Sequence, residues 1–207
     1  MKASALILAG GESRRFGSDK SLLRVGGELL IERSLREWGR LFEDVVIACG
    51  AKKKFCLPGV TEAVDVYPER GPLGGVHAGL GAARFPWTFV VACDMPGIDA
   101  DFVTELFQYA GEDCRIVLPR HDGILEPLCG LYHKDCFAVA ERMLSENRNC
   151  ILEMYDVMPV RYVKTRNCFF NVNYPGDVDG IGRHTKNSSR RFKRRLMDFC
   201  SEKGLND

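Results

Sequence analysis

Short apolar runs alternate along the chain with longer segments whose apolar residues recur at helical spacing. The runs of strand length, each bounded by turn residues, lie at residues 3–9, 44–49, 61–66, 88–93 and 114–119, with a weaker one at 161–164. Helical periodicity marks residues 28–42, 72–85 and 100–110. Repeated strand–helix–strand units place successive strands side by side in the same direction. The pattern therefore predicts an α/β fold with a mostly parallel sheet between two layers of helices.

The size and charge of the chain indicate one principal domain with a basic extension. The chain has 207 residues, 45% of them apolar and 28% charged, which is enough for a sizeable core. Residues 1–182 carry 21 Lys and Arg against 25 Asp and Glu, whereas residues 183–207 carry 8 against 3. We predict a folded domain at 1–182 and a C-terminal extension at 183–207 that forms a short helix. The extension is either solvated or loosely docked, or it contacts an acidic partner or a polyanion.

Neither a membrane segment nor a cysteine framework is expected. The longest apolar stretches have about six to eight residues, far short of the roughly 20 that cross a bilayer, and no signal peptide is recognisable. We expect a cytoplasmic protein without a membrane or nucleic acid partner. The nine cysteines are scattered and include no Cys-x-x-Cys pair, which indicates reduced thiols and no zinc site.

A segment rich in glycine and cations, LILAGGESRRFGSDK, begins within the first predicted strand. Gly10 and Gly11 let backbone N–H groups approach an anion without obstruction by a Cβ atom. Arg14, Arg15 and Lys20 add positive charge, so the segment has the makeup of a polyphosphate-binding loop. Its glycine spacing matches neither the Walker A pattern nor the dinucleotide-binding fingerprint. The alternative, a strand-to-helix turn with solvated charges, would suffice for the two glycines alone.

Two carboxylates follow predicted strands at the edge of the sheet where such folds bind ligands. Asp94 comes directly after the apolar run FVVAC, and an oxygen ligand in that place can hold Mg²⁺ and bridge it to phosphates. Asp65 also lies at a strand end, with a weaker case because surface acids are common in this chain. The alternative interpretation of both is that of ordinary turn residues.

These segments together resemble the molybdenum cofactor guanylyltransferases of the MobA type, within the nucleotidyltransferase superfamily. The resemblance runs from Ala3 to Gly180 and is carried, in order, by LILAGGESRRFGSDK, VYPERGPLGGVHAGL, VVACDMPGI, EPLCGLY and FFNVNYPGD. It implies a Rossmann-like α/β/α nucleotidyltransferase fold. The second glycine of LAGG favours GTP, because LAAG is the more usual form in relatives that use CTP. Gly50 departs from the pattern, since an Asn is frequent there, and Phe16 replaces a usual Met.

The resemblance implies roles for individual residues. It implies that Leu8, Ala9, Gly10 and Gly11 bind the guanine nucleotide, that Lys20 contacts its phosphates, that Asp65 lies in the guanosine pocket, that Asp94 binds Mg²⁺ and the nucleotide, and that Asn171 and Asn173 lie on the molybdopterin side of the cleft. The implied reaction transfers GMP from GTP to Mo-molybdopterin and releases pyrophosphate.

The catalytic groups follow from the chemistry of that reaction. The attacking terminal phosphate of the pterin is already an anion, so no Ser, Cys or His base is required. Asp94 with Mg²⁺, and Lys20 with Arg15, are the expected catalytic groups. Transient contacts with other molybdenum cofactor biosynthesis proteins or with acceptor molybdoenzymes are also expected. Two alternatives stay open: a cytidylyl- or other nucleotidyltransferase with a different phosphorylated acceptor, and a regulatory module that binds nucleotide or polyanions without turnover.

Overall fold

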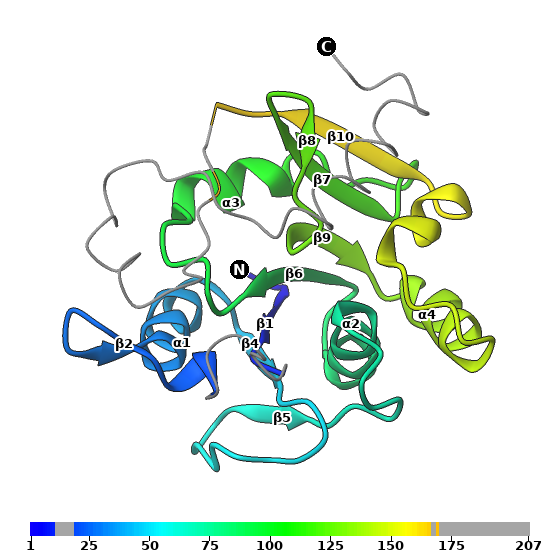
Figure 1. Cartoon of the computed structure of the whole chain (residues 1–207). Helices are drawn as coiled ribbons and strands as arrows, with labels where there is room; N and C mark the ends of the chain where they lie inside the picture. The colour runs from blue at the N-terminus through cyan, green and yellow to red at the C-terminus, as the bar shows by residue number, and fades with distance from the viewer. Residues whose placement is uncertain (11–18, 167–168, 170–207) are drawn as a thin grey trace.

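The computed structural model describes residues 1–10, 19–166 and 169, with the side chain of Lys20 left out (Figure 1). The strands are β1 (Ser4–Leu8), β2 (Arg24–Val25), β3 (Glu28–Leu29), β4 (Asp44–Ala48), β5 (Thr61–Ala63), β6 (Trp87–Ala92), β7 (Ile116–His121), β8 (Ile124–Leu125), β9 (Cys129–His133) and β10 (Val160–Lys164). The α-helices are α1 (Leu30–Leu41), α2 (Pro72–Ala82), α3 (Ala100–Phe107) and α4 (Cys136–Ser145), with 3₁₀ helices η1 (Lys20–Leu22) and η2 (Ile151–Asp156).

The principal sheet of the described chain has β1 at its centre. Its strand order is β10-β7-β9-β6-β1-β4-β5, with β8 paired to β7 alone. β1 runs parallel to β4 and β6, and its last residue, Leu8, lies opposite Ala48 and Ala92. β9 is antiparallel to both β6 and β7, so β6 and β7 point the same way. The carboxyl ends of β1 and of all strands parallel to it therefore meet at one edge of the sheet.

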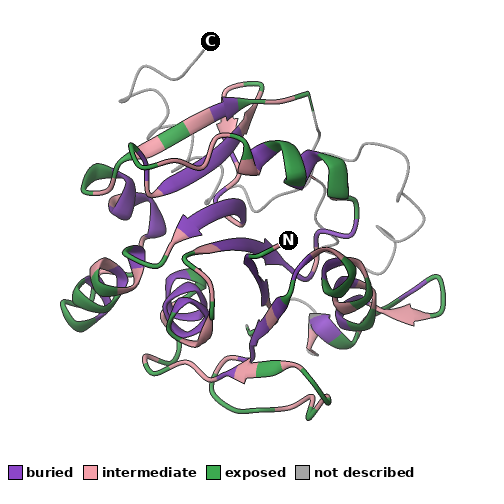
Figure 2. Ribbon diagram, turned by 180° about the vertical axis from the view of Figure 1, so that it is seen from behind, coloured by how far each residue is buried: buried purple, intermediate pink, exposed green. Residues whose placement is uncertain are grey.

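Helices cover both faces of this sheet, with α1 and α3 on one side of the central strands and α2 and α4 on the other (Figure 1). Successive residues of β1 alternate between the two cores, since Leu6 packs on the α2 side and Ile7 on the α1 side. Figure 2 shows the central strands buried, while the helices are buried mainly where they face the sheet. Burial on both faces explains why these strands are continuous apolar runs in the sequence. The fold is the Rossmann-like three-layer α/β/α arrangement that the sequence predicts.

Glycines allow α2 to lie close to β1. A Cβ atom on Gly79 would lie 2.2 Å from the side chain of Leu6, and one on Gly75 would lie 3.1 Å from Leu8. Gly71, which precedes the helix, has a φ of 64°, and Pro72 starts its first turn. This packing holds the N-terminal turn of α2 beside the carboxyl end of β1.

Within the described residues the structure contains every predicted strand and the three helices predicted at 28–42, 72–85 and 100–110, with somewhat different bounds, and it adds β8, β9, α4, the β2–β3 hairpin and the two 3₁₀ helices. β9 was not predicted because its apolar run is short and is broken by Gly130. That glycine is needed where it stands, since a Cβ atom would lie 2.8 Å from the carbonyl oxygen of Val117 in β7. Contact with a neighbouring strand, which is not visible in a local pattern, therefore decides the residue.

The predicted extension at 183–207 lies outside the described residues, so the division at residue 182 stays a prediction. In the described part of the chain, no helix has both the length and the apolar character of a bilayer span. No disulfide joins any two of the cysteines placed there.

Candidate functional site

The candidate site lies at the carboxyl edge of the sheet, beyond the end of β1. The chain passes from β1 to β4 on one side and returns to β6 on the other, so the strand order reverses at this point. Hydrogen bonds continue past the strand ends, from Ala9 N to Ala48 O at 3.0 Å and from Cys93 N to Leu8 O at 3.1 Å. The segments that follow β1, β4 and β6 are thus held side by side.

The exits of β1 and β4 touch backbone to backbone at Gly10 and Gly50. A Cβ atom on Gly10 would lie 2.4 Å from the nitrogen and 2.8 Å from the Cα atom of Gly50. Gly50 has a φ of 77°, a region that Gly and Asn adopt at least cost, and its carbonyl accepts the N–H of Asp65 at 2.8 Å. Close approach of the two exits therefore requires a glycine at position 10. This reason is separate from the access for an anion, which is the role that the sequence predicts for Gly10.

Asp65 lies just beyond β5, with its carboxylate against the first turn of α2. Its Oδ2 is 3.4 Å from the place that a Cβ atom on Gly74 would take. Its Oδ1 is buried and has no hydrogen-bond partner among the described residues. Burial raises the pKa of the Asp65 carboxyl above its ordinary value. A buried acceptor left without a donor is costly, so this oxygen is a candidate to accept an N–H or O–H group of a ligand.

Asp94 occupies the turn after β6 and is partly buried. A hydrogen bond from Met95 N to Ala92 O at 3.1 Å closes the turn, and the neighbouring Cys93 N–H ties it to β1 through Leu8. Among the described residues, no three His, Cys, Asp or Glu side chains gather as a preformed metal site. Mg²⁺ commonly binds through one or two carboxylates together with substrate phosphates, and a strand-end carboxylate at this edge fits that mode.

The backbone groups of Leu8 and Ala9 already have partners within the protein. The oxygen of Leu8 accepts from Cys93, the nitrogen of Ala9 donates to Ala48, and the oxygen of Ala9 accepts from Nζ of Lys54 at 2.8 Å. A carbonyl oxygen has two lone pairs, so each can still accept one ligand donor. Gly10 is exposed at this edge, whereas Ala9 is buried. Backbone contacts of these residues with a nucleotide stay predictions.

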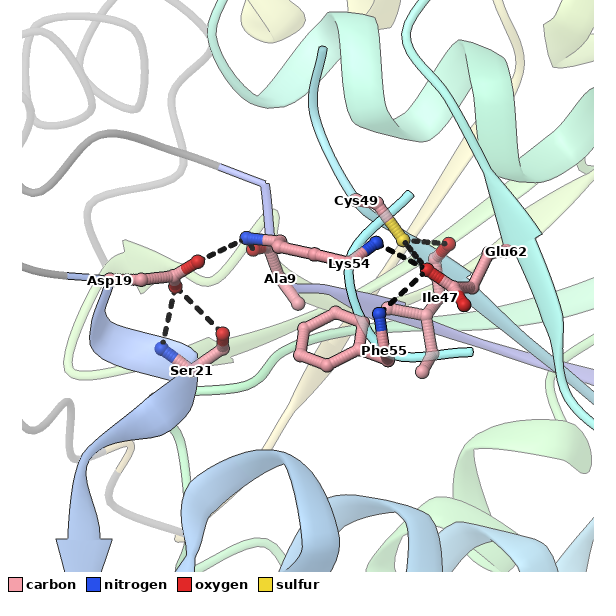
Figure 3. A network of polar contacts seen from close by, with 8 residues as sticks. All are labelled: Ala9, Asp19, Ser21, Ile47, Cys49, Lys54, Phe55 and Glu62. Carbon is pink, nitrogen blue, oxygen red and sulfur yellow. Dashed lines mark hydrogen bonds and ion pairs between the residues drawn. The ribbon is translucent and has the colours of Figure 1, made fainter. Parts of the chain in front are cut away.

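Lys54, in the segment between β4 and β5, joins the residues on either side of segment 10–18. Its ammonium donates to the carbonyl of Ala9 and forms an ion pair with the carboxylate of Asp19 (Figure 3). Asp19 also accepts the backbone N–H and the hydroxyl of Ser21 at 3.0 and 2.7 Å. Burial opposes ionisation of Asp19, but the bonds from Lys54 and Ser21 outweigh it and lower its pKa. Asp19 is therefore held as an anion between two donors.

Glu62 of β5 fixes the segment that carries Lys54. Its Oε2 accepts the backbone N–H groups of Lys54 and Phe55 at 2.9 and 3.1 Å and the thiol of Cys49 at 3.1 Å (Figure 3). Burial alone would raise the pKa of Glu62, but the backbone donors outweigh it and lower the pKa to about 2. The ring of Phe55 lies 5.3 Å from the ammonium of Lys54, within cation–π range. The position of Lys54 is thus fixed from the sheet.

Sequence reasoning did not single out Lys54 or Glu62. Residues 52–54 are three successive lysines, a pattern typical of a solvated surface, yet only the first two are exposed while the Lys54 side chain is 21% exposed. The available signal was the place of the run, soon after a strand whose carboxyl end lies at the binding edge.

His77 is a buried residue of α2. It is 2% exposed, its ring is stacked on Phe137 with 4.6 Å between centroids, and Tyr67 lies edge-on to it. Neither ring nitrogen has a hydrogen-bond partner in the described part of the chain. Burial lowers the pKa of His77, so the ring is neutral at physiological pH. These contacts give His77 a packing role, and the implied reaction requires no His base.

A basic hollow lies farther along the same edge, at the carboxyl ends of β7 and β10. Its volume is about 450 Å³, and it is lined by Arg120, His121, Asp122, Gly123, Lys164, Thr165 and Arg166. The ring of His121 contacts the carbonyl of Thr165 at 3.1 Å, which joins the ends of the two strands.

Several predicted site residues lie outside the described residues: Gly11, Arg14, Arg15, Asn171 and Asn173. The side chain of Lys20 is not described either, although its backbone opens η1 directly after Asp19. Their roles stay predictions.

Comparisons with known proteins agree with the fold. The family described as the MobA-like NTP transferase domain matches residues 5–158. A protein of Pelotomaculum thermopropionicum named "Probable molybdenum cofactor guanylyltransferase" is 35% identical over 187 residues, which cover 86% of this chain and 91% of the relative. The crystal structure of molybdopterin-guanine dinucleotide biosynthesis protein A from Archaeoglobus fulgidus is similar with a TM-score of 0.71 and 25% identity, over 96% of this chain and 99% of the other. The 2-C-methyl-D-erythritol 4-phosphate cytidylyltransferase of Thermus thermophilus shares the fold, with a TM-score of 0.66 and 18% identity, over 86% and 96% of the two chains.

Proposed function

The chain belongs to the MobA-like NTP transferase family and transfers GMP in the synthesis of the guanine dinucleotide form of the molybdenum cofactor, and we propose that GTP is the donor, Mo-molybdopterin the acceptor and Mg²⁺ the metal. The observation that carries this proposal is the arrangement of carboxylates at the binding edge. Asp65, one of whose buried oxygens has no hydrogen-bond partner in the described part of the chain, follows β5. Asp94 follows β6, and the exits of β1 and β4 lie between the two. At roughly 4.8 Å per strand, the two segments are about 14 Å apart, a span suited to a nucleotide laid across the edge.

We place the guanosine at Asp65 and the phosphates toward Asp94. A buried carboxylate oxygen matches the N–H and O–H donors of a guanosine. Asp94 would hold Mg²⁺, which supplies positive charge to the phosphate oxygens when it is bound. The acceptor would lie on the far side of Asp94, toward the basic hollow. This direction is supported by the anionic character of the acceptor and by Arg166, which precedes Asn171 and Asn173 by a few residues.

The proposed chemistry is an in-line displacement at the α-phosphorus. An oxygen of the terminal phosphate of the pterin attacks, a new P–O bond forms, and the bond from the α-phosphorus to the bridging oxygen of pyrophosphate breaks. The protein contributes position and charge, because the nucleophile needs no base. We assign Lys20 and Arg15, and in addition Arg14, to the charge of the departing pyrophosphate.

Pyrophosphate release tests this proposal. The purified full chain is incubated with Mo-molybdopterin and with GTP, CTP or ATP in parallel, with and without Mg²⁺. We expect release of pyrophosphate and formation of the guanine dinucleotide in the reaction that contains both GTP and Mg²⁺, and in none of the other reactions. Faster release with CTP would favour a cytidylyltransferase, and nucleotide binding without release for any acceptor would favour a regulatory module.

Replacing Asp65 by asparagine is expected to weaken GTP binding without lowering the stability of the fold. Asn keeps one acceptor but places an N–H₂ group against the donors of guanosine, so KM for GTP should rise about tenfold or more while kcat changes little. The raised pKa of Asp65 means that its ionised form destabilises the folded state above that pKa. Asn cannot ionise, so Asp65→Asn should unfold at the same or a higher temperature at pH 7.

Steady-state kinetics and thermal unfolding check this prediction. Glu69→Gln is the matched control, because Glu69 is an exposed carboxylate of the same connection between β5 and α2. A GTP KM of Asp65→Asn equal to that of the control would remove Asp65 from the guanosine pocket.

A further inference from the structure

We propose that Lys54 is a positioning residue for the donor nucleotide: its ammonium joins Ala9, at the exit of β1, to Asp19, directly before Lys20, and so holds these two residues in place for binding of GTP. We call these two contacts of Lys54 the Lys54 bridge. The inference rests on the proposed function, because it takes Ala9 and Lys20 to contact GTP.

The geometry of the Lys54 bridge supports a positioning role. Ala9 is the first residue after β1 that bonds to β4, and Asp19 is the residue before η1, and one ammonium contacts both. The segment carrying Lys54 is itself anchored to β5 through Glu62, so the bridge holds Ala9 and Asp19 in place relative to the sheet (Figure 3). Groups that are held in place before the ligand arrives lose less conformational entropy when it binds.

The charges of the Lys54 bridge support the same role. Asp19 is an anion directly before Lys20, the residue expected to contact the phosphates of GTP. With Lys54 present, that negative charge is compensated at hydrogen-bond distance. Without the ammonium, Asp19 would be left as an uncompensated anion that repels the triphosphate. Loss of Lys54 therefore weakens GTP binding in two ways, because it breaks the link between Ala9 and Asp19 and leaves the charge of Asp19 uncompensated. Loss of the Asp19 charge only breaks the link.

Direct contact of Lys54 with the phosphates is the competing interpretation, and it predicts a different ranking of the variants by GTP affinity. If Lys54 bound phosphate itself, removing the charge of Asp19 would release the ammonium toward the ligand and GTP would bind more tightly. If Lys54 instead acts through the Lys54 bridge, removing the charge of Asp19 weakens GTP binding.

The test uses the full-length chain with five variants: Lys54→Met, Lys54→Arg, Asp19→Asn, the double variant Asp19→Asn/Lys54→Met, and Lys53→Met as the matched control on the exposed neighbour. GTP binding in Mg²⁺ is measured by calorimetry, and KM for GTP and for the acceptor by pyrophosphate release. We expect Lys54→Met to weaken GTP binding about tenfold or more, the scale of a lost charge-assisted hydrogen bond. Asp19→Asn should weaken it less, and the double variant should bind like Asp19→Asn because no uncompensated charge remains.

The remaining readouts separate positioning from a purely structural role. KM for the acceptor should stay at the wild-type value, Lys54→Arg should restore most of the GTP affinity, and Lys53→Met should stay within twofold of wild type. Equal GTP affinity of Lys54→Met and Lys53→Met would overturn the inference. Tighter binding by Asp19→Asn than by wild type would overturn it in favour of direct phosphate contact.

An NMR titration of Asp19 keeps failure of the Lys54 bridge distinct from failure of the proposed function. The pKa of Asp19 should rise in Lys54→Met and stay unchanged in Lys53→Met, and this readout needs no nucleotide. If the rise is observed but the wild-type chain binds no GTP, the proposed function fails and the inference fails with it. If the wild-type chain binds GTP and Asp19 does not respond to Lys54→Met, the inference alone fails.

Discussion

Replacement of Asp94 by alanine is expected to lower the rate of GMP transfer by about 100-fold or more, the scale seen when one electrostatic contact to the reacting group is removed. The turn that carries Asp94 is fixed by backbone hydrogen bonds at Ala92 and Leu8, which do not depend on the side chain. The variant should therefore keep the fold of the site edge while losing the carboxylate proposed to hold Mg²⁺. Pyrophosphate release at saturating GTP and acceptor measures the effect, and thermal unfolding checks that the fold is kept.

The control for Asp94→Ala is Asp101→Ala. Asp101 is an exposed carboxylate in the first turn of α3, and the hydrogen bond that it makes to Asp99 uses its backbone N–H, which alanine retains. This variant should transfer GMP at nearly the wild-type rate. The concentration of Mg²⁺ that gives half-maximal activity should rise in Asp94→Ala and not in Asp101→Ala. Full Mg²⁺-dependent transfer by Asp94→Ala would end the assignment of the metal to this residue.

The sequence predicts those parts of the site that depend on local signals. Asp94 follows a strand buried on both faces, whose apolar run is visible in the sequence, and its position after that run already indicates the binding edge. Gly10 is visible as part of a glycine pair after the first strand. The contact that Gly10 makes with Gly50 is not visible in the sequence, because it depends on the parallel pairing of β1 with β4. That pairing places Leu8 opposite Ala48, which is 40 residues farther along the chain.

The Lys54 bridge could not be predicted from the sequence for a related physical reason. Lysine is ordinarily solvated, and three adjacent lysines give no local sign that the third differs from the other two. Lys54 differs because Glu62, on the next strand, accepts the backbone N–H of Lys54 and so fixes the backbone there. The Lys54 side chain then reaches Asp19. Roles that arise from the meeting of three separate segments require the fold before they can be assigned.

Replacement of Gly10 by alanine is expected to lower the free energy of unfolding by about 1–3 kcal/mol, the usual cost of overpacking a well-packed contact. The added Cβ atom would lie 2.4 Å from the backbone nitrogen of Gly50, and no side-chain rotation can relieve a contact with backbone. The exits of β1 and β4 would have to separate. That shift would also move Ala9, whose carbonyl is one end of the Lys54 bridge, so GTP affinity should fall together with stability.

Gly39→Ala is the control that isolates this contact, because Gly39 lies within α1 and nothing is within 4 Å of the place its Cβ atom would take. Alanine in an open helical position is expected to raise the free energy of unfolding by about 0.5–1 kcal/mol, so the same substitution should act with opposite sign at the two glycines. Urea denaturation measures both values, and GTP titration should show a loss for Gly10→Ala alone. Gly10 has no positive φ, so backbone conformation does not account for the difference. If Gly10→Ala were as stable as wild type and bound GTP normally, the close contact between the exits of β1 and β4 would not govern this site.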